Sequence, residues 1–518
     1  MKPKFSSYPY TKLKISMLVG IIAISIFSNC KKDIKSPAKD ILSFTIKKEL
    51  NTNLTADIKA LIDGTNITVS VPEGTKITKL KPTIILSEKA SVSPANEVEQ
   101  DFTNPVKYNV MAQDGTTKEY TITITVKTIP LVFKYKSKDN SVDVSWTAES
   151  GATKYKVTYK TKSTELTEMA ITTTTSNIPN IVYDSLYYVE VQALNDNATV
   201  LNSTKIRFTP SIKWTREMEH ATWTPRSFLP VVVYNNKLWL FGGTTGKDGN
   251  NNSYIGSNEL WSSSDGKTWE KQTTATSIPL YAFPTCVVFG SKIWLIGGAT
   301  NDSFKPSVWS FDGTDWTSAS ATGFSSTLFF CYANVFNNKV WLYGQGGVYG
   351  FDGLAWTNYS YPVSQYSGQA VISYNNLVWN IGGFTATCNT GHDKVYSSTG
   401  PATDTWTRHR GMAGDDCSTQ ADEYWSGRGN HSVVEYGGKI WLMGGLRGNS
   451  VNLNDVWIGN GLTWQKQKVA DWSARNDFGA VVFNDKIWVM GGTTDNRTTN
   501  LNDVWSGGIE IATQNGWE

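Results

Sequence analysis

The sequence of 518 residues predicts an all-β protein in which two small β-sandwiches in tandem precede a six-bladed β-propeller. Three observations support this fold class. The composition, with 43 Gly, 21 Trp and only 18% charged residues, is typical of short strands joined by many turns and excludes a disordered or coiled-coil chain. Apolar and polar residues alternate with a period of two through much of residues 41–210. From residue 211 onward, Trp recurs along the chain.

The charge and the cysteine content exclude two further classes. The formal net charge is +3, but Lys2, Lys4, Lys12 and Lys14 lie in the first 29 residues, which contain no acid. The remaining chain is therefore close to neutral, and no nucleic acid partner is expected. Five Cys in a chain of this length do not make a disulfide scaffold.

Residues 1–29 predict a secretory signal. The first 14 residues are basic, and an apolar run follows from Ile15 to Phe27. A helix of these 13 residues would be about 20 Å long, too short for a bilayer core of about 30 Å. The alternative is an uncleaved anchor helix.

The end of this run, Phe27-Ser28-Asn29-Cys30, resembles a bacterial lipoprotein cleavage box, although Asn29 stands where Gly or Ala is typical. The resemblance implies that Cys30 is the lipid attachment site. We expect residues 30–40 to be a polar stalk and the later chain to be soluble, held by a lipid anchor in the outer membrane and facing the periplasm or the cell surface.

Residues 41–128 predict the first sandwich. Short alternating runs such as Ile67–Val71 and Tyr120–Val126 are separated by turns such as Asp114-Gly115, which indicates antiparallel strands with one buried face. The run Val71–Thr75, with the later Asp114-Gly115 and Tyr120, resembles the immunoglobulin-like module near the start of many bacterial surface lipoproteins.

Residues 129–210 predict the second sandwich. Val142–Trp146 forms a strand with an inward Trp, and Tyr155–Tyr159 and Tyr187–Ala193 follow. This spacing resembles a fibronectin type III domain, with Tyr187 in the position of the tyrosine that closes a corner. Neither module carries a catalytic constellation, so both are interpreted as spacers.

Residues 211–518 contain six copies of one pattern. An aromatic residue, a pair of turn formers and then Trp recur at a fixed spacing, with the Trp at Trp239, Trp294, Trp341, Trp379, Trp441 and Trp488. The intervals between these Trp average close to the 50 residues of one blade. A Gly-Gly pair follows each Trp except in the third copy, which has Gly344-Gln345. The pattern resembles the kelch repeat of galactose oxidase-like propellers.

The sixth copy stops after Trp505 without a fourth strand, whereas Ile212-Lys213-Trp214 resembles a fourth strand placed ahead of the first copy. We therefore expect residues 211–217 to complete the last blade. The alternative is a seven-bladed ring, but the sequence contains no seventh hairpin of this pattern.

Three loops between blades carry a Trp-Ser/Thr-x-Arg motif, which makes their Trp and Arg the candidate ligand-binding residues: Trp223, Arg226, Trp425, Arg428, Trp472 and Arg475. The three blades are neighbours in a closed ring, and Arg and Trp suit acidic groups and sugar rings. The loops 244–257, 384–394 and 411–424 are expected over the same face. The alternative is structural, with each Arg stacked on its own Trp and bonded to carbonyl groups between blades.

Other chemistry finds little support in the sequence. Four scattered His make a poor metal set, so neither a metal nor another cofactor is expected, and copper-radical oxidation lacks its ligands. Cys388 and Cys417 are candidates for a disulfide that pins two long loops, whereas Cys286 and Cys331 are expected to be buried.

These patterns favour a lipid-anchored envelope protein whose propeller recognises a glycan or a protein partner without catalysis. Two alternatives remain. The six-bladed ring also resembles bacterial sialic acid mutarotases, which implies an enzyme acting on a sugar acid at the propeller rim, and the propeller could serve as a protein scaffold alone.

Overall fold

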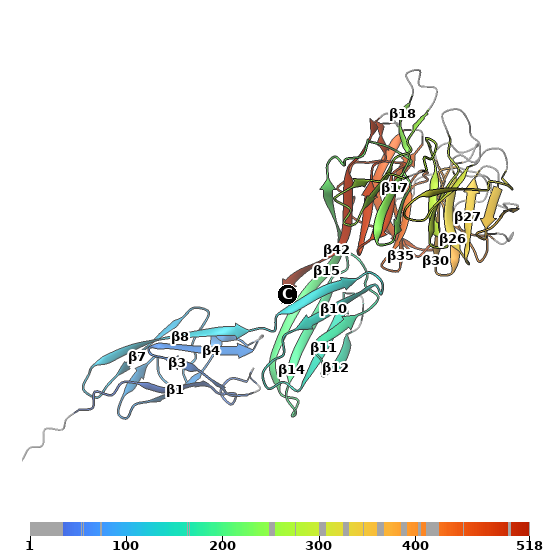
Figure 1. The fold of residues 1–518 in the computed structure, drawn as a ribbon. Helices are drawn as coiled ribbons and strands as arrows, with labels where there is room; N and C mark the ends of the chain where they lie inside the picture. The colour runs from blue at the N-terminus through green and yellow to red at the C-terminus, as the bar shows by residue number, and fades with distance from the viewer. Residues whose placement is uncertain are drawn as a thin grey trace, which may run out of the picture. The chain divides into compact units, whose positions relative to one another are not determined.

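A computed structural model gives the fold (Figure 1). It describes residues 35–518 apart from residues 53, 55, 73, 74, 163, 165, 248–253, 275, 300–306, 325–330, 345, 346, 360–366, 385–390, 402–405, 411–423, 449, 496–498, 517 and 518. The chain divides after Val126 into two compact units. Apart from 3₁₀ conformation in η1 (Ile77–Lys79) and at Asp495, the described residues form strands, turns and loops, which confirms the all-β fold class.

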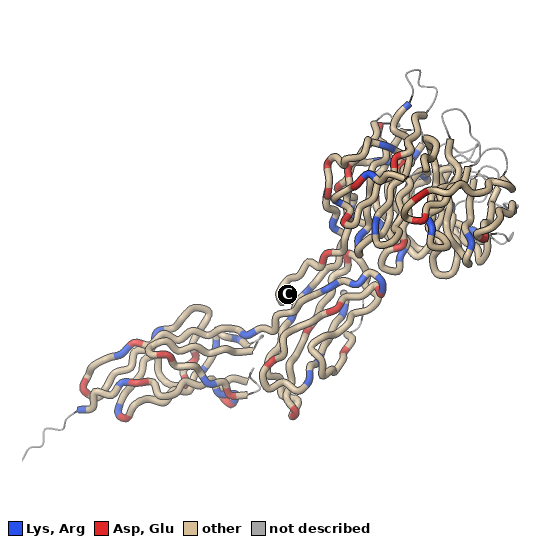
Figure 2. The backbone as a smooth tube through the Cα atoms, viewed as in Figure 1, with Lys and Arg blue, Asp and Glu red and all other residues tan. Residues whose placement is uncertain are grey.

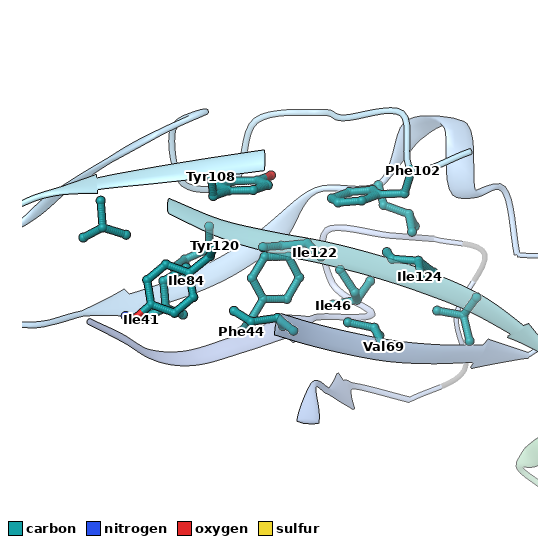
Figure 3. Close-up of a cluster of buried hydrophobic side chains, with 14 of the residues drawn as sticks. Ile41, Phe44, Ile46, Val69, Ile84, Phe102, Tyr108, Tyr120, Ile122 and Ile124 are labelled. Atoms are coloured by element: carbon teal, nitrogen blue, oxygen red, sulfur yellow. Dashed lines mark hydrogen bonds between the residues drawn. The ribbon is translucent and has the colours of Figure 1, made fainter. Parts of the chain in front are cut away.

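The first unit is a β-sandwich of two antiparallel sheets, with the orders β2-β1-β5 and β3-β4-β8-β7-β6. Its strands are β1 (Ile41–Ile46), β2 (Ile58–Lys59), β3 (Leu61–Asp63), β4 (Asn66–Pro72), β5 (Pro82–Leu86), β6 (Ser91–Ser93), β7 (Val106–Met111) and β8 (Thr117–Lys127). Alternate residues of β4 are buried, as the period of two predicts. Figure 3 shows the core between the sheets, where Phe44 meets Tyr108 edge to face with ring centroids 5.9 Å apart.

The second unit begins with another sandwich. One sheet has the order β13-β10-β9, and the strands β12, β11, β14 and β15 are consecutive neighbours in the other. The bounds are β9 (Leu131–Lys136), β10 (Ser141–Trp146), β11 (Lys154–Thr161), β12 (Thr167–Ile171), β13 (Thr175–Ile178), β14 (Tyr187–Leu194) and β15 (Val200–Met218). The hydroxyl of Tyr187 accepts a hydrogen bond of 2.8 Å from the backbone N–H of Val182, so Tyr187 closes a corner as predicted.

In the described chain, five four-stranded antiparallel sheets and one end of a seven-stranded sheet form the six blades of the propeller. The first three blades are β16 (Val231–Tyr234), β17 (Lys237–Phe241), β20 (Leu260–Ser263) and β21 (Glu270–Lys271); β22 (Thr285–Phe289), β23 (Lys292–Ile296), β24 (Val308–Phe311) and β25 (Trp316–Ala319); and β26 (Tyr332–Phe336), β27 (Lys339–Gly344), β28 (Gly347–Phe351) and β29 (Trp356–Tyr359). The next two are β30 (Ala370–Tyr374), β31 (Leu377–Ile381), β32 (Val395–Ser398) and β33 (Thr407–Arg410); and β34 (Ser432–Tyr436), β35 (Lys439–Arg447), β36 (Val451–Gly459) and β37 (Trp464–Lys466). The sixth consists of β38 (Gly479–Phe483), β39 (Lys486–Met490), β42 (Val504–Asn515) and the end of β15.

Two short hairpins stand between the second and third strands of their blades. They are β18 (Thr244–Lys247) with β19 (Tyr254–Gly256) in the first blade and β40 (Thr493–Thr494) with β41 (Thr499–Asn500) in the sixth. In the fifth blade, β35 and β36 continue the same connection as one long hairpin, pairing as far as Arg447 with Val451. These hairpins lie at the end of the blades where the blade-to-blade loops run, which we call the loop face.

The spacing between the aromatic residue and Trp has a structural reason in every blade. The indole N–H of the Trp donates to the carbonyl oxygen of the aromatic residue five positions earlier, at distances between 2.8 and 3.1 Å. The two residues of each turn have positive φ, as a tight hairpin between twisted strands requires. Tyr234, Tyr374 and Tyr436 also donate their hydroxyls to backbone carbonyls of the next hairpin, which links adjacent blades.

Residues 211–218 close the ring. They form the end of β15 and pair antiparallel with β42, in the register Ser211↔Glu510 through Arg216↔Trp505. The same two strands also pair within the second sandwich, from Ile206↔Asn515 onward, so one sheet runs from the sandwich into the sixth blade (Figure 1). The C-terminal strand is therefore an added strand of the sandwich as well as part of the propeller.

A buried carboxylate reinforces this closure. The side chain of Glu217 is 6% exposed and accepts hydrogen bonds from Lys267 of the first blade at 2.7 Å and from Ser506 of β42 at 2.6 Å. Lys486 of β39 lies 3.5 Å away. Burial opposes the charge on Glu217, but the bonds from Lys267 and Ser506 outweigh it and lower its pKa. Glu217 thus ties the first blade to the last.

The second sandwich packs on the hairpin of the fifth blade. Tyr183 meets Trp441 edge to face with ring centroids 5.3 Å apart, and Tyr135 lies 6.1 Å from Tyr436. A Cβ atom on Gly437 would overlap the hydroxyls of both sandwich tyrosines, whereas one on Gly438 would meet open space. This contact explains why the turn of the fifth blade begins with glycine where four other blades have Asn.

Charged side chains of both signs are interspersed along each module, and the tube shows no large region of one sign (Figure 2). In the part of the chain that the structure describes, no helix has the length and apolar character needed to cross a membrane.

We predict that Gly437→Asn destabilises the second unit, because the new side chain has to displace Tyr183 and Tyr135. Overpacking of this kind costs about 1–3 kcal/mol. The free energy of unfolding in urea, followed by Trp fluorescence, measures the effect. Gly438→Asn is the matched control, since both glycines have φ near 60° and Asn tolerates that conformation. Equal stability of the two variants would contradict the packing.

Candidate functional site

The three copies of the Trp-Ser/Thr-x-Arg motif lie within the loops between blades, but their side chains do not reach the surface. The three Arg side chains are 0% exposed and the three Trp residues 1%. Each guanidinium lies over its own indole ring, with the guanidinium carbon between 5.7 and 6.0 Å from the ring centroid. The fold therefore brings the Arg and Trp of each motif copy together as a pair, but each pair lies below the surface.

Each Arg is fully bonded within its blade, and Arg475 shows the pattern. Its Nε donates to the carbonyl of Ser473 at 3.0 Å, and Nη1 donates to the carbonyl of Gly491 at 2.9 Å. Nη1 and Nη2 also form a bidentate pair with Asp503 at 2.6 and 2.7 Å. Gly491 is the first residue of the Gly-Gly pair, so the Arg fixes the loop to the end of the second strand. Arg428 makes the same contacts, including a bidentate pair with Asp455. Arg226 makes the same two carbonyl contacts, but only its Nη2 donates to Glu259, and its Nη1 also donates to the hydroxyl of Ser257 at 3.2 Å.

The carboxylates that pair with the Arg residues come from the third strand or the residues just before it. They are Glu259, Asp455 and Asp503, and each also accepts the indole N–H of the Trp two residues later. Burial opposes the charge on Glu259, but hydrogen bonds from Lys271, Arg226 and Trp261 outweigh it and lower its pKa to about 2. Glu259 therefore stays charged at neutral pH, and with Arg226 it forms a neutralised pair. We call each Arg–carboxylate pair a clamp.

The Asn before these carboxylates reaches into the next blade. The amide of Asn502 donates to the carbonyls of Ala221 at 3.0 Å and Trp223 at 3.1 Å, which joins the sixth blade to the first. Asn454 joins the fifth blade to the sixth in the same way. In the second blade, Tyr281 takes the position of the Arg and accepts the indole N–H of Trp309 at 2.9 Å.

The expectation that Trp223, Arg226, Trp425, Arg428, Trp472 and Arg475 contact a ligand is corrected by this burial. The side-chain hydrogen bonds of the three Arg go to their own blades, and each guanidinium lies over its own Trp, as in the structural alternative. A buried guanidinium needs a paired acid and carbonyl acceptors, and the blade supplies both.

The residues two positions after the motif Arg lie at the mouth of the central channel. Phe228, Phe283, Gly368, Asn430 and Asp477 occupy the same position in five blades, and all have φ between 48° and 70°. In the third blade this position lies outside the described residues. Backbone hydrogen bonds join neighbours in this set: Asn430 donates to Gly368 at 2.6 Å, Asp477 to Asn430 at 3.0 Å, and Phe228 to Asp477 at 2.7 Å. We call these five residues the mouth ring.

The mouth ring surrounds a cavity of about 240 Å³ in the axis of the propeller. The inner strands of all six blades line it, and many of the lining side chains are small, among them Ala333, Ala370 and Ala480. Such a pocket, lined by the inner strands of six blades, is a candidate binding site of the described propeller.

The two halves of the mouth differ in chemistry. Over the first two blades, Phe228 meets Phe283 with ring centroids 4.5 Å apart, and Tyr254 of the β18–β19 hairpin meets Phe283 at 4.7 Å. Over the fifth and sixth blades, the lining includes the polar residues Asn430 and Asp477. The mouth therefore combines an aromatic side with a hydrogen-bonding side.

Sequence analysis selected the loops that lead to the mouth ring, but the Trp and Arg residues it named there are buried. The signal that marks the mouth ring is an unusual one: at a fixed distance after the Arg position, the chain has Gly, Asn or Asp in three blades and Phe in two. The first three types tolerate positive φ, which indicates a left-handed position, and Phe at such a position is rare.

Several predicted features lie outside the described residues, including the proposed lipid attachment at Cys30, the Cys388 and Cys417 pair and the loop 411–423. Cys331 is buried as expected, and burial raises the pKa of its thiol to about 12. Cys286 is half-buried on the neighbouring inner strand. Among the described residues, no cluster of His, Cys, Asp and Glu has the arrangement of a metal site.

The comparisons with known proteins agree with this architecture. Residues 211–515 match the model of the DUF6242 beta propeller domain, and the chain belongs to that family. Residues 41–124 match the model described as "SGBP, N-terminal", and residues 130–209 match the fibronectin type III domain. A solved structure described as "Structure of YjhT" aligns over 58% of this chain and the whole of that chain, with 13% identity and a TM-score of 0.43. No curated protein matches the chain.

A buried histidine beside the fifth-blade clamp makes the propeller sensitive to acid. His431 is 5% exposed, and burial and the charge of Arg428 lower its pKa to about 3. The folded state thus keeps the ring neutral, whereas the unfolded chain takes up a proton near pH 6.5. The contribution of His431 to the free energy of unfolding is therefore complete above pH 6.5 and is lost as the pH falls towards 3.

We predict that the unfolding free energy falls by about 2 kcal/mol more between pH 7 and pH 5 in the wild type than in His431→Leu. Leu occupies the corresponding position, Leu229, in the first blade, so the variant is expected to fold. Urea titrations at the two pH values measure the difference. Glu259 does not affect the comparison, because it is present in both proteins and contributes equally to both pH profiles. Parallel pH profiles for the two proteins would contradict the assignment.

Proposed function

We propose that this protein is a non-catalytic, glycan-binding protein of the cell surface, and that its propeller carries the binding site at the mouth ring. The match of residues 41–124 to the SGBP N-terminal model supports this function, since SGBP denotes a surface glycan-binding protein. The observation that carries it is the mouth itself, in which aromatic rings and hydrogen-bonding groups face one cavity. Sugar rings combine apolar C–H faces with hydroxyl groups and suit both halves.

The two sandwiches suit a spacer role in this function. Their described residues place apolar side chains in closed cores, and the second sandwich shares a continuous sheet with the propeller. The shared sheet would hold the propeller firmly on the module that precedes it. The kelch-like repeat pattern agrees with such a propeller, because its conserved spacing serves the hairpins and leaves the loop face to vary.

The enzymatic alternative, a mutarotase or epimerase for a sugar acid, has lost its main argument. It required the three Arg side chains at the rim to pair with the acid group of the substrate. Arg226, Arg428 and Arg475 are instead neutralised inside the blades. A binding function requires these three Arg residues only to hold the loops in place.

A panel of purified oligosaccharides tests the function. Isothermal titration of the whole protein with maltohexaose, cellohexaose, laminarihexaose, xylohexaose, mannohexaose, chitohexaose and an oligogalacturonate is expected to give saturable binding of at least one sugar. The bound sugar should be recovered unchanged in mass and with an unaltered rate of anomer exchange by NMR. Absence of binding to every member, or chemical turnover, would contradict the proposal.

The membrane attachment is proposed separately, at Cys30. We expect Cys30→Ser to move the protein from the membrane fraction to the soluble fraction of the cell, because one lipidated residue supplies the attachment. Mass spectrometry of the wild-type N-terminal peptide should show an acylated Cys30. Membrane retention of the Ser variant with residues 1–29 intact would instead support the uncleaved anchor helix.

A further inference from the structure

A second cavity lies where the second sandwich meets the fifth blade, at the end of the blade opposite the loop face. Its volume is about 390 Å³, within the range of about 300–1,000 Å³ that is typical of small-molecule sites. The sandwich contributes Asn140 and residues 180–183, and the blade contributes Lys439 and residues 458–460 and 463–465. Both modules belong to one compact unit and share a sheet, which holds the two walls together.

The walls of this cavity carry one cation and no acid. Lys439 is the one charged residue among the lining residues. It is half-buried, and its ammonium group forms no hydrogen bond or ion pair with the described part of the chain. The side-chain amides of Asn180 and Gln465, which also line the cavity, are equally without partners among the described residues. A cation and free hydrogen-bonding groups without a carboxylate favour an anionic ligand.

In three other blades, the Lys at the position of Lys439 faces a carboxylate. Lys292 stands opposite Asp312 in the second blade and Lys339 opposite Asp352 in the third, one position beyond the paired residues of their strands. The hydrogen bonds of its turn, and then the charge of Lys292, lower the pKa of Asp312 to about 2. In the sixth blade, the corresponding Lys lies 3.5 Å from Glu217. The usual partner of this Lys is therefore an acid within the propeller.

The fifth blade keeps the turn but lacks the carboxylate. In the register of β35 and β36, Lys439 stands opposite Asn460. The side-chain oxygen of Asn460 accepts the backbone N–H groups of Leu462 at 3.0 Å and Thr463 at 2.8 Å. Asp312 accepts the two corresponding N–H groups in the second blade. Asn serves the turn as Asp does, so the difference between the blades is the missing negative charge.

We propose that this cavity is a second binding site, separate from the mouth ring, for an anionic sugar unit. Its carboxylate or sulfate group pairs with Lys439 in place of the missing acid, and its hydroxyls bond to the amides of Asn180 and Gln465. The negative charge of the ligand follows from the lining, whereas the choice of a sugar rests on the proposed glycan-binding function.

The ligand touches both modules in this arrangement. Asn180 and Val182 belong to the connection between β13 and β14 of the sandwich, and Val182 remains 48% exposed in the cavity wall. An apolar side chain among hydrogen-bonding groups suits a sugar ring, which has both C–H groups and hydroxyls. The second sandwich thus has a binding role in addition to its role as a spacer.

The test titrates the whole protein with tri-galacturonate by isothermal calorimetry. The fully methyl-esterified trisaccharide is the matched ligand, because it keeps the rings and removes the charge. We expect the ester to bind at least about tenfold more weakly, as for loss of a hydrogen-bonded ion pair. A sulfated tetrasaccharide of κ-carrageenan, titrated in parallel, shows whether the bound anion is a carboxylate or a sulfate.

Two variants remove the pairing in different ways. Lys439→Gln removes the cation, and Asn460→Asp supplies the carboxylate that the second and third blades have naturally, so this variant is expected to fold. Each should weaken binding of the anionic sugar by about tenfold. The control is Lys237→Gln in the first blade, because this Lys has the same place in the repeat, forms no ion pair with the described residues and does not line the cavity. Circular dichroism and the urea midpoint verify folding.

A third variant tests the contribution of the sandwich. Asn180 has φ 54°, which Gly adopts without strain, so Asn180→Gly removes the amide and preserves the backbone. Binding of the anionic sugar should weaken in this variant, because the amide is one wall of the site. Unchanged affinity would contradict a site shared between the two modules.

The outcomes separate this inference from the proposed function. If neither anionic sugar binds, or if Lys439→Gln and Asn460→Asp fold normally and bind as the wild type does, the second site is overturned. A neutral hexasaccharide that still binds in that case leaves the proposed function standing. If an anionic sugar binds through Lys439 and no neutral sugar binds, this inference stands and the mouth ring is not the binding site.

Discussion

The pairing of β15 with β42 is the constraint on which the rest of the structure depends. Six blades enclose an axial cavity only if the last is joined to the first, and here a strand that precedes the first blade completes the sixth. The same ladder continues into the second sandwich, so the closure also fixes that module. Glu217 adds a buried ionic contact between the first and last blades at this seam. The position of every mouth residue follows from this closed circle.

The clamps beneath the loop face connect the closed ring to the site. Each motif Arg binds a carbonyl of the Gly-Gly pair and a carboxylate in or just before the third strand, so the loop cannot shift without breaking a buried ion pair. The chain then turns through a left-handed residue into the channel mouth. The motif that is most visible in the sequence therefore has a positioning role, and the residues two positions later face the cavity. Rigid support of this kind keeps the cost of ordering a ligand site low.

The fold was predictable to a large extent because its signals are local. The alternation in β4, the turn pairs with positive φ and the fixed spacing from Tyr436 to Trp441 each arise from contacts within one hairpin or one sheet face. The tyrosine corner at Tyr187 is also a contact over five residues. The candidate site was predictable only as far as the loops, since Arg475 and Asp503 are 28 residues apart and their pairing is visible only in the folded blade.

The sequence by itself determined the sandwiches, the six hairpins and the missing fourth strand, because period, turn chemistry and repeat spacing act over short stretches of chain. Only the tertiary structure decided whether the Arg and Trp side chains face solvent, because that depends on acceptors from other strands. It also decided that Phe228 and Phe283 meet across two blades and that Gly437 leaves room for Tyr183 and Tyr135. Contacts between distant segments set burial, and burial separates a structural arginine from a binding one.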